Sequence, residues 1–167
     1  GHWHTNHGGS YIAAGLDSGI AGKGFHLGVI DDPLSEQNAR SKPAQKSAFT
    51  WYGSGFYTRQ SPDVSAILAM GTRWSKGDLF GQLLALQNTE NEYADDWSVV
   101  RIPAVLDNET AETLNELSDD PLLKDLRFPK RYKFKAGGSF APRRWSLEKL
   151  LRIKANVYST DWESIYQ

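Results

Sequence analysis

The stretch GFHLGVIDDP, residues 24–33, decides how the rest of the chain is interpreted. Residues 27–30 are mostly apolar and lead into two adjacent acids, after which Pro33 follows. Such a run is typical of a buried strand, and proline ends the strand because it has no N–H to donate to a ladder. The stretch therefore predicts a strand that presents Asp31 and Asp32 at its carboxyl end, where open α/β sheets bind their ligands.

A second segment ends in the same way. Residues 64–70, VSAILAM, form another apolar run, and Thr72 and Arg73 follow it. Between the two runs, Ser41 is placed to begin a helix whose apolar side chains recur at helical spacing towards Arg59. The order strand, helix, strand predicts parallel strands joined by a right-handed crossover. Both polar ends would then lie at the same edge of the sheet, so we expect a functional site there.

Further elements are expected on either side of this pair. Residues 11–16 predict a short strand. Residues 97–102, which precede Pro103, predict a third strand after the two apolar runs. Ser75 and Asp78 resemble a capping box, which would open a helix rich in leucine. These elements extend the alternation of strands and helices that is typical of α/β proteins.

The pattern of the chain changes after residue 105. Residues 107–117 predict a short acidic helix, and Ser146 is placed to begin a last helix. The side chains of that last helix expected to face inward are Leu147, Leu150, Leu151 and Ile153. We therefore divide the chain into residues 1–105 and residues 106–167.

Composition is that of an ordinary globular protein. The 167 residues suffice for one domain with a core, or for one domain and a small appendage. The formal net charge of -1 gives no bulk attraction to nucleic acid or to membranes, and the lack of cysteine excludes disulfides and thiolate metal sites. No apolar run approaches the ~20 residues of a membrane span, so we expect no membrane partner.

Several short motifs, taken in order, resemble the terminase large subunit of tailed bacteriophages, the motor that packages viral DNA into the procapsid. These motifs are VIDDP at 29–33, FYTR at 56–59, MGTRW at 70–74, GDLFGQLL at 77–84, WSVVRIPAV at 97–105 and WESIYQ at 162–167. The resemblance implies an α/β fold that is part of a P-loop NTPase of the ASCE type, with a mainly parallel sheet and flanking helices. Residues 1–105 would be the C-terminal half of the packaging ATPase domain. Residues 106–167 would be a small, irregular or helical linker subdomain leading to a nuclease domain.

The resemblance also implies a role for each residue at the two strand ends. Asp31 would hold the Mg²⁺ of bound ATP. Asp32 would also contribute to nucleotide binding, and it would be the catalytic carboxylate that orients or deprotonates the attacking water. Thr72 would be the residue of the coupling motif that senses the γ-phosphate. Many members of the family have glutamate at the position of Asp32, so this shorter side chain needs a slightly closer water.

Two parts of the family pattern are not found in this sequence. The phosphate-binding loop, GxxxxGK[ST], does not occur, and neither does the acidic metal cluster of the nuclease domain. The chain therefore resembles a middle piece of such a protein. We expect the isolated chain neither to bind ATP tightly nor to hydrolyse it, and we expect residues 64–70 to have an unpaired apolar edge.

Partners and location follow from the same resemblance. It implies double-stranded DNA, the portal protein and the small terminase subunit as partners, a homo-oligomeric ring in the working motor, and the cytoplasm of the bacterial host. DNA contacts are expected in the basic and aromatic stretch 124–135, at Lys130, Arg131 and Lys133. The same stretch also fits a solvated loop whose aromatic residues anchor it to a core.

Other functions fit parts of the sequence. In one, the chain is a non-catalytic module that binds DNA or a partner protein, and the two acids are merely the polar end of a strand. In another, Asp31, Asp32 and His26 serve a metal-dependent phosphoesterase, although no second acidic cluster follows a matching strand. A metal site formed by the N-terminal histidines is a further alternative. The glycine-rich composition of the same segment argues against it, because such a segment is expected to be mobile.

Overall fold

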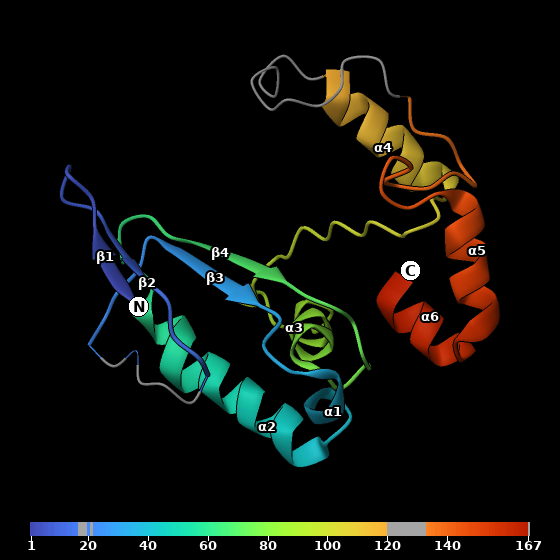
Figure 1. Cartoon of the computed structure of the whole chain (residues 1–167). Coiled ribbons are helices and arrows are strands. Elements are labelled where there is room, and N and C mark those ends of the chain that lie inside the picture. Colours follow the sequence, from blue (N-terminus) through green and yellow to red (C-terminus); the bar gives the residue numbers. More distant parts are fainter. Residues whose placement is uncertain (17–19, 21, 120–132, 167) are drawn as a thin grey trace. The chain divides into compact units, whose positions relative to one another are not determined.

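The structure, a computed structural model, describes residues 1–16, 20, 22–119 and 133–166. The chain forms two compact units, Gly1–Asp96 and Trp97–Gln167 (Figure 1). The boundary between them lies earlier than the division at residue 105 that the sequence suggests, so residues 97–105 belong to the second unit.

The first unit begins with a small antiparallel hairpin. Strand β1 (His2–His4) pairs with β2 (Ser10–Ile12), with His2 opposite Ile12. The prediction of a strand at residues 11–16 is therefore correct only as far as Ile12 and wrong for the residues that follow. Backbone hydrogen bonds between Gly1 and Ala13 continue the pairing by one residue, and residues 14–16 belong to no strand.

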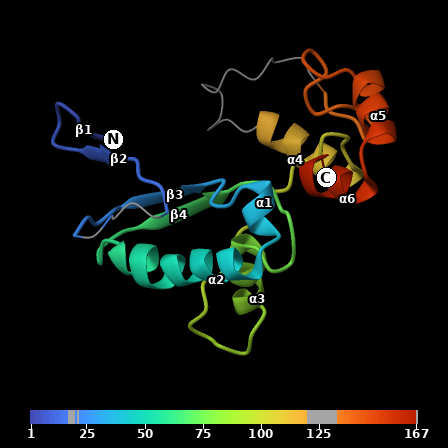
Figure 2. The same cartoon turned by 60° about the horizontal axis from the view of Figure 1, so that its bottom comes forward.

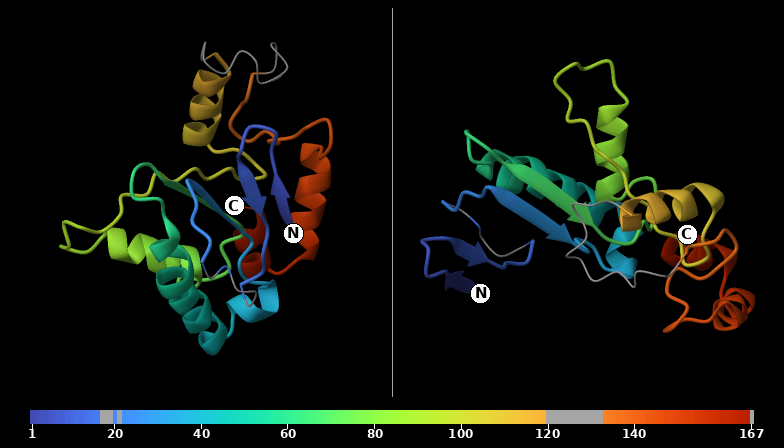
Figure 3. Two further views of the ribbon diagram at one scale, coloured as in Figure 1. Left: turned by 90° about the vertical axis from the view of Figure 1, so that its left-hand side faces the viewer. Right: turned by 90° about the horizontal axis from the view of Figure 1, so that it is seen from above.

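The central element of the first unit is a parallel pair of strands. Strand β3 (Leu27–Asp31) pairs with β4 (Ala66–Met70), and the register places Asp31 opposite Met70. The two arrows run side by side in the same direction (Figures 1 and 2, and the right-hand view of Figure 3). The predicted parallel pair is thus confirmed, as is the prediction that both strands end at the same edge. Within the described residues the sheet has only these two strands.

Helix α2 (Lys42–Trp51) runs beside this pair and continues into a π-helical turn, η1 (Tyr52–Phe56), and a 3₁₀ turn, η2 (Tyr57–Arg59) (Figure 2). The helix begins after Ser41 and ends before Gln60, as predicted. Phe56 is buried, and an ideal Cβ on Gly28 of β3 would lie 2.5 Å from its ring. The missing side chain at position 28 thus allows η1 to pack directly against the sheet.

Two short helices flank the carboxyl ends of the strands. Helix α1 (Glu36–Ala39), which the sequence pattern did not indicate, begins where the Ser35 hydroxyl accepts a hydrogen bond from the Asn38 N–H. Helix α3 (Leu79–Gln87) buries Leu79 and Leu83 and contacts α2. The expected capping box was misplaced: the residue that caps α3 is Asp78 and not Ser75.

The described residues of the second unit form the helices α4 (Asn108–Asp119), α5 (Leu147–Asn156) and α6 (Ser159–Tyr166). The acidic helix α4 is confirmed, and so is the start of α5 at the Ser146 cap. Helix α6 was not predicted, and it buries Trp162.

Two details of the second unit correct the sequence analysis. Residues 97–102 do not form a strand, because no described segment pairs with them, and Val100 is 76% exposed. Of the residues expected to face inward on α5, Leu150 is buried, whereas Leu147 and Leu151 are exposed. The buried face of α5 is therefore narrower than the leucine pattern suggests.

Among the described residues, no helix combines the length and the apolar character needed to cross a membrane.

Candidate functional site

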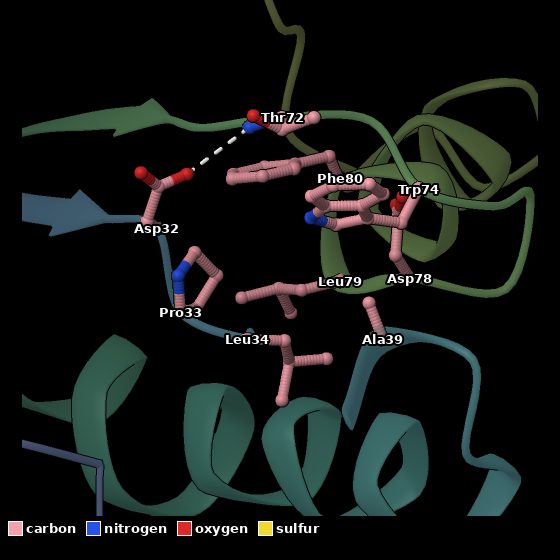
Figure 4. A pocket seen from close by; sticks show the side chains of 9 residues that line it. All are labelled: Asp32, Pro33, Leu34, Ala39, Thr72, Trp74, Asp78, Leu79 and Phe80. Atoms are coloured by element: carbon pink, nitrogen blue, oxygen red, sulfur yellow. Dashed lines mark hydrogen bonds between the residues drawn. The ribbon is translucent and has the colours of Figure 1, made fainter. Parts of the chain in front are cut away.

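The carboxyl ends of β3 and β4 are joined by both backbone and side chain. The backbone N–H of Asp32 donates to the Met70 carbonyl at 3.0 Å, which extends the strand ladder by one residue. The Asp32 Oδ1 in turn accepts a hydrogen bond from the Thr72 N–H at 3.1 Å (Figure 4). The structure thus brings together two residues that the sequence analysis singled out, from segments that lie far apart in the chain.

The backbone at this junction takes conformations that few residues adopt. Asp32 has a φ of 42°, in the left-handed region, which is uncommon for a residue with a side chain. Gly71 has a φ of 157°, and an ideal Cβ there would lie 2.9 Å from both Asp32 Oδ1 and the Phe80 ring. Unusual backbone conformations of this kind concentrate at functional sites, where the surrounding structure holds them in place.

Asp78 organises the loop that carries Thr72. Its side chain is buried, at 4% exposure, and its Oδ1 accepts a hydrogen bond from the Gly81 N–H at 2.8 Å. Its Oδ2 accepts a hydrogen bond from the Ser75 N–H at 3.0 Å. The carboxylate also forms an ion pair with the Arg73 Nε at 3.2 Å. One buried carboxylate therefore binds both the start of α3 and the loop between β4 and α3.

Two glutamines fasten the same loop from neighbouring helices. The Gln82 side-chain amide, on α3, donates to the Gly77 carbonyl at 2.8 Å. The Gln45 amide, on α2, donates to the Ser75 hydroxyl at 3.1 Å. Neither glutamine stands out in the sequence, because a helical glutamine is usually a solvent-exposed residue.

A small pocket lies beside Asp32 and Thr72 (Figure 4). Its walls are polar at Asp32, Thr72 and Asp78 and otherwise mainly apolar, formed by Pro33, Leu34, Ala39, Trp74, Leu79 and Phe80. Its volume of about 10 Å³ is roughly that of one water. The pocket as it stands can hold a water beside the Asp32 carboxylate, but no nucleotide.

The chemistry of the two acids fits a hard divalent cation. Mg²⁺ prefers oxygen ligands and is usually held by one or two carboxylates together with waters and substrate phosphates. Asp31 and Asp32 supply such carboxylates at one strand end, and Asp31 shares the exposed face of β3 with Val29. Within the described residues, no group of three or more potential ligand side chains gathers at one point. Phosphate oxygens and water would therefore complete the coordination of a cation here.

The other residues singled out in the sequence lie elsewhere. Lys130 and Arg131 fall outside the described residues. Lys133 forms an ion pair with Asp119 at 2.9 Å, with both side chains exposed. His26 precedes β3 and is exposed, so it is not part of the pocket beside Asp32. Arg59 lies in η2, and its Nε is buried without a hydrogen-bond partner among the described residues.

Asp78 is a residue of this site that the sequence analysis missed, since it was expected only as part of a capping box that begins at Ser75. A signal was present, because aspartate is among the best N-caps and the leucine-rich run follows it directly.

Comparison with known proteins gives no family model that matches this chain and no significantly similar curated sequence.

Proposed function

We propose that this chain is part of an ATP-hydrolysing motor of the terminase large-subunit type, which moves double-stranded viral DNA into procapsids. The observation that carries the proposal is the hydrogen bond between Asp32 and Thr72 at the ends of two parallel strands. In nucleotide hydrolases of this kind, carboxylates at a strand end bind Mg²⁺ and orient the attacking water. The mixed α/β character of the structure is consistent with such a fold, and the P-loop NTPase fold itself is part of the proposal.

Each residue at the site has a distinct proposed role. Asp31 holds the Mg²⁺, which would offset negative charge on the phosphates when bound. Asp32 orients the attacking water and accepts its proton, since its Oδ1 is fixed by the Thr72 N–H while its other oxygen makes no hydrogen bond within the described residues. Thr72 reports the state of the γ-phosphate to the loop that follows it.

Binding of the nucleotide itself requires more than the residues present here. The sequence contains no GxxxxGK[ST] motif, and the pocket beside Asp32 has room for about one water. We therefore propose that the phosphate-binding loop comes from a longer protein of which this chain is a part. Portal protein, small subunit, DNA, a homo-oligomeric ring and the cytoplasm of the bacterial host belong to the same proposal.

A second candidate is a non-catalytic module that binds a partner protein. One face of the β3–β4 pair favours it, because Leu27, Val29, Leu68 and Met70 are all exposed there. Parallel strands are normally covered on both faces, so this apolar face is suited to further protein contact. In the leading proposal the remainder of the ATPase domain would cover the face, whereas in the second a separate protein would.

Nucleotide binding separates the two candidates. A fluorescent ATP analogue should bind the product of the complete reading frame in the presence of Mg²⁺, and Asp31→Asn should raise the Mg²⁺ concentration required by about tenfold or more. The isolated 167-residue chain should neither bind the analogue tightly nor hydrolyse ATP. Absence of analogue binding by the complete protein would favour the partner-binding module instead.

A further inference from the structure

The side chain of Asp78 does more than cap a helix. We propose that Asp78 is a positioning residue, which locks the loop between β4 and α3 so that the Thr72 N–H is held against Asp32. The effect on catalysis rests on the proposed function above, whereas the effect on the loop does not. The hydrogen bonds of the Asp78 side chain go to Arg73, Ser75 and Gly81 and not to Asp32 or Thr72, so its proposed effect on Thr72 passes through the loop.

Asp78 has more hydrogen-bond partners than a helix cap needs. An N-cap needs one oxygen that accepts from an N–H in the first turn, and serine or threonine supplies it as well as aspartate. Oδ1 of Asp78 meets this need through Gly81. Oδ2 is directed to the loop, where it accepts from the Ser75 N–H at 3.0 Å. The Arg73 Nε lies between the two oxygens, 3.3 Å from Oδ2 and 3.2 Å from Oδ1. A cap alone does not require this second set of contacts.

The loop between β4 and α3 packs closely on the helices around it. An ideal Cβ on Gly81 would collide with the Lys76 carbonyl and would lie 3.0 Å from an Arg73 guanidinium nitrogen. An ideal Cβ on Gly77 would lie 2.7 Å from the Gln45 side-chain oxygen. Absence of side chains at both glycines thus lets the loop lie directly against α3 and α2.

The consequence concerns Thr72, which directly precedes Arg73 in the chain. With Arg73 and Ser75 both bound to one buried carboxylate, the backbone at Thr72 has little freedom to turn away from Asp32. Catalytic groups must be held within about 0.5 Å of their productive geometry, and hydrogen bonds from neighbouring residues provide that restraint. Loss of the second Asp78 oxygen should therefore free Thr72 while leaving α3 capped.

Asp78→Ser separates these two tasks, because serine keeps the cap while it removes the oxygen that binds the Ser75 N–H and the negative charge that pairs with Arg73. Amide hydrogen exchange of the 167-residue chain, followed by NMR, is the first measurement. In Asp78→Ser the Thr72 amide should exchange roughly 2- to 10-fold faster, as expected for loss of one hydrogen bond. The amide of Leu83 within α3 should keep its rate. Ser146→Ala, which removes the cap of α5 in the other unit, is the matched control and should leave Thr72 unchanged.

ATP turnover by the complete protein is the second measurement. Asp78→Ser should lower kcat about 10- to 100-fold, since small misplacements of reacting groups have effects of this size, with little change in KM. A wild-type protein without turnover would refute the proposed function, and the exchange rates would still test the positioning role. An unchanged Thr72 exchange rate in Asp78→Ser would overturn that role. If Asp78→Ser does not fold, Arg73→Gln keeps the cap and breaks the ion pair, and it should show the same faster exchange at Thr72.

Discussion

Gly71 and Asp32 approach each other so closely that no side chain fits at position 71. An ideal Cβ there would lie 2.9 Å from the Asp32 Oδ1, the same atom that accepts the hydrogen bond from Thr72. The φ of Gly71, 157°, is also one that residues with side chains rarely adopt. Position 71 therefore requires glycine both for its backbone conformation and for the space beside the carboxylate.

Gly71→Ala should destabilise the chain by about 1–3 kcal/mol, through backbone strain and displacement of the Asp32 side chain. Urea unfolding would give the free energy, and the chemical shift of the Thr72 amide would report the lost hydrogen bond. Gly53→Ala is the matched control, because an added Cβ meets nothing within 4 Å there. A Gly71→Ala protein as stable as the wild type, with an unchanged Thr72 shift, would show that the contact is not needed.

Leu79 and Leu86 lie on the same helix and differ in burial, at 0% and 46% exposure. Leu79→Ala should lower the free energy of unfolding by about 2–5 kcal/mol, because it leaves a cavity beneath the pocket next to Asp32. Leu86→Ala should change it by no more than about 0.5 kcal/mol, as is usual for an exposed position. Equal losses for the two variants, measured by urea unfolding, would contradict the packing of α3 described above.

Because of Tyr57, we expect the free energy of unfolding to depend on pH in the alkaline range. Its hydroxyl donates to Asp95 Oδ1 at 2.9 Å, and this hydrogen bond, followed by burial, raises the pKa of Tyr57 above its ordinary value of 10.0. Burial also raises the pKa of Tyr52. A raised pKa in the folded state means that the stabilisation is fully present below about pH 10 and is lost as the pH rises through the folded pKa.

Tyr57→Phe should therefore make the fall in unfolding free energy above about pH 10 less steep. Urea unfolding at a series of pH values from about 8 to 11 provides the measurement. Tyr158→Phe is the control, because Tyr158 is 82% exposed, and its profile should follow that of the wild type. A Tyr57→Phe profile that also matches the wild type would show that the bond to Asp95 does not influence stability.

The parallel pair and its converging ends could be predicted because the information is local. Each strand is a short apolar run with a clear end, at Pro33 for the first and at Gly71 for the second. A helix lies between them, and a right-handed crossover then places both ends at one edge. The proximity of Asp32 to Thr72 follows from these rules, although the hydrogen bond between them does not.

The sequence-based predictions are wrong at positions where tertiary contacts determine the local structure. Residues 97–102 have the composition of a strand, but a strand also needs a partner, and no described segment pairs with them. From the sequence, Asp78 could have been either the N3 residue of a capping box that begins at Ser75 or the N-cap itself. It is the N-cap, and its buried carboxylate also contacts Arg73 and Ser75. On α5, packing against a small core leaves Leu151 exposed, which the spacing of leucines does not reveal.

ATP turnover by the product of the complete reading frame, with Asp32→Asn compared with the wild type, tests the central claim most directly. Asp63→Asn, at an exposed acid before β4, is the matched control. If Asp32 orients and deprotonates the attacking water, Asp32→Asn should lower kcat by about 100-fold or more, while the affinity for ATP stays close to that of the wild type and Asp63→Asn remains fully active. An Asp32→Asn protein that hydrolyses ATP at the wild-type rate would contradict the account.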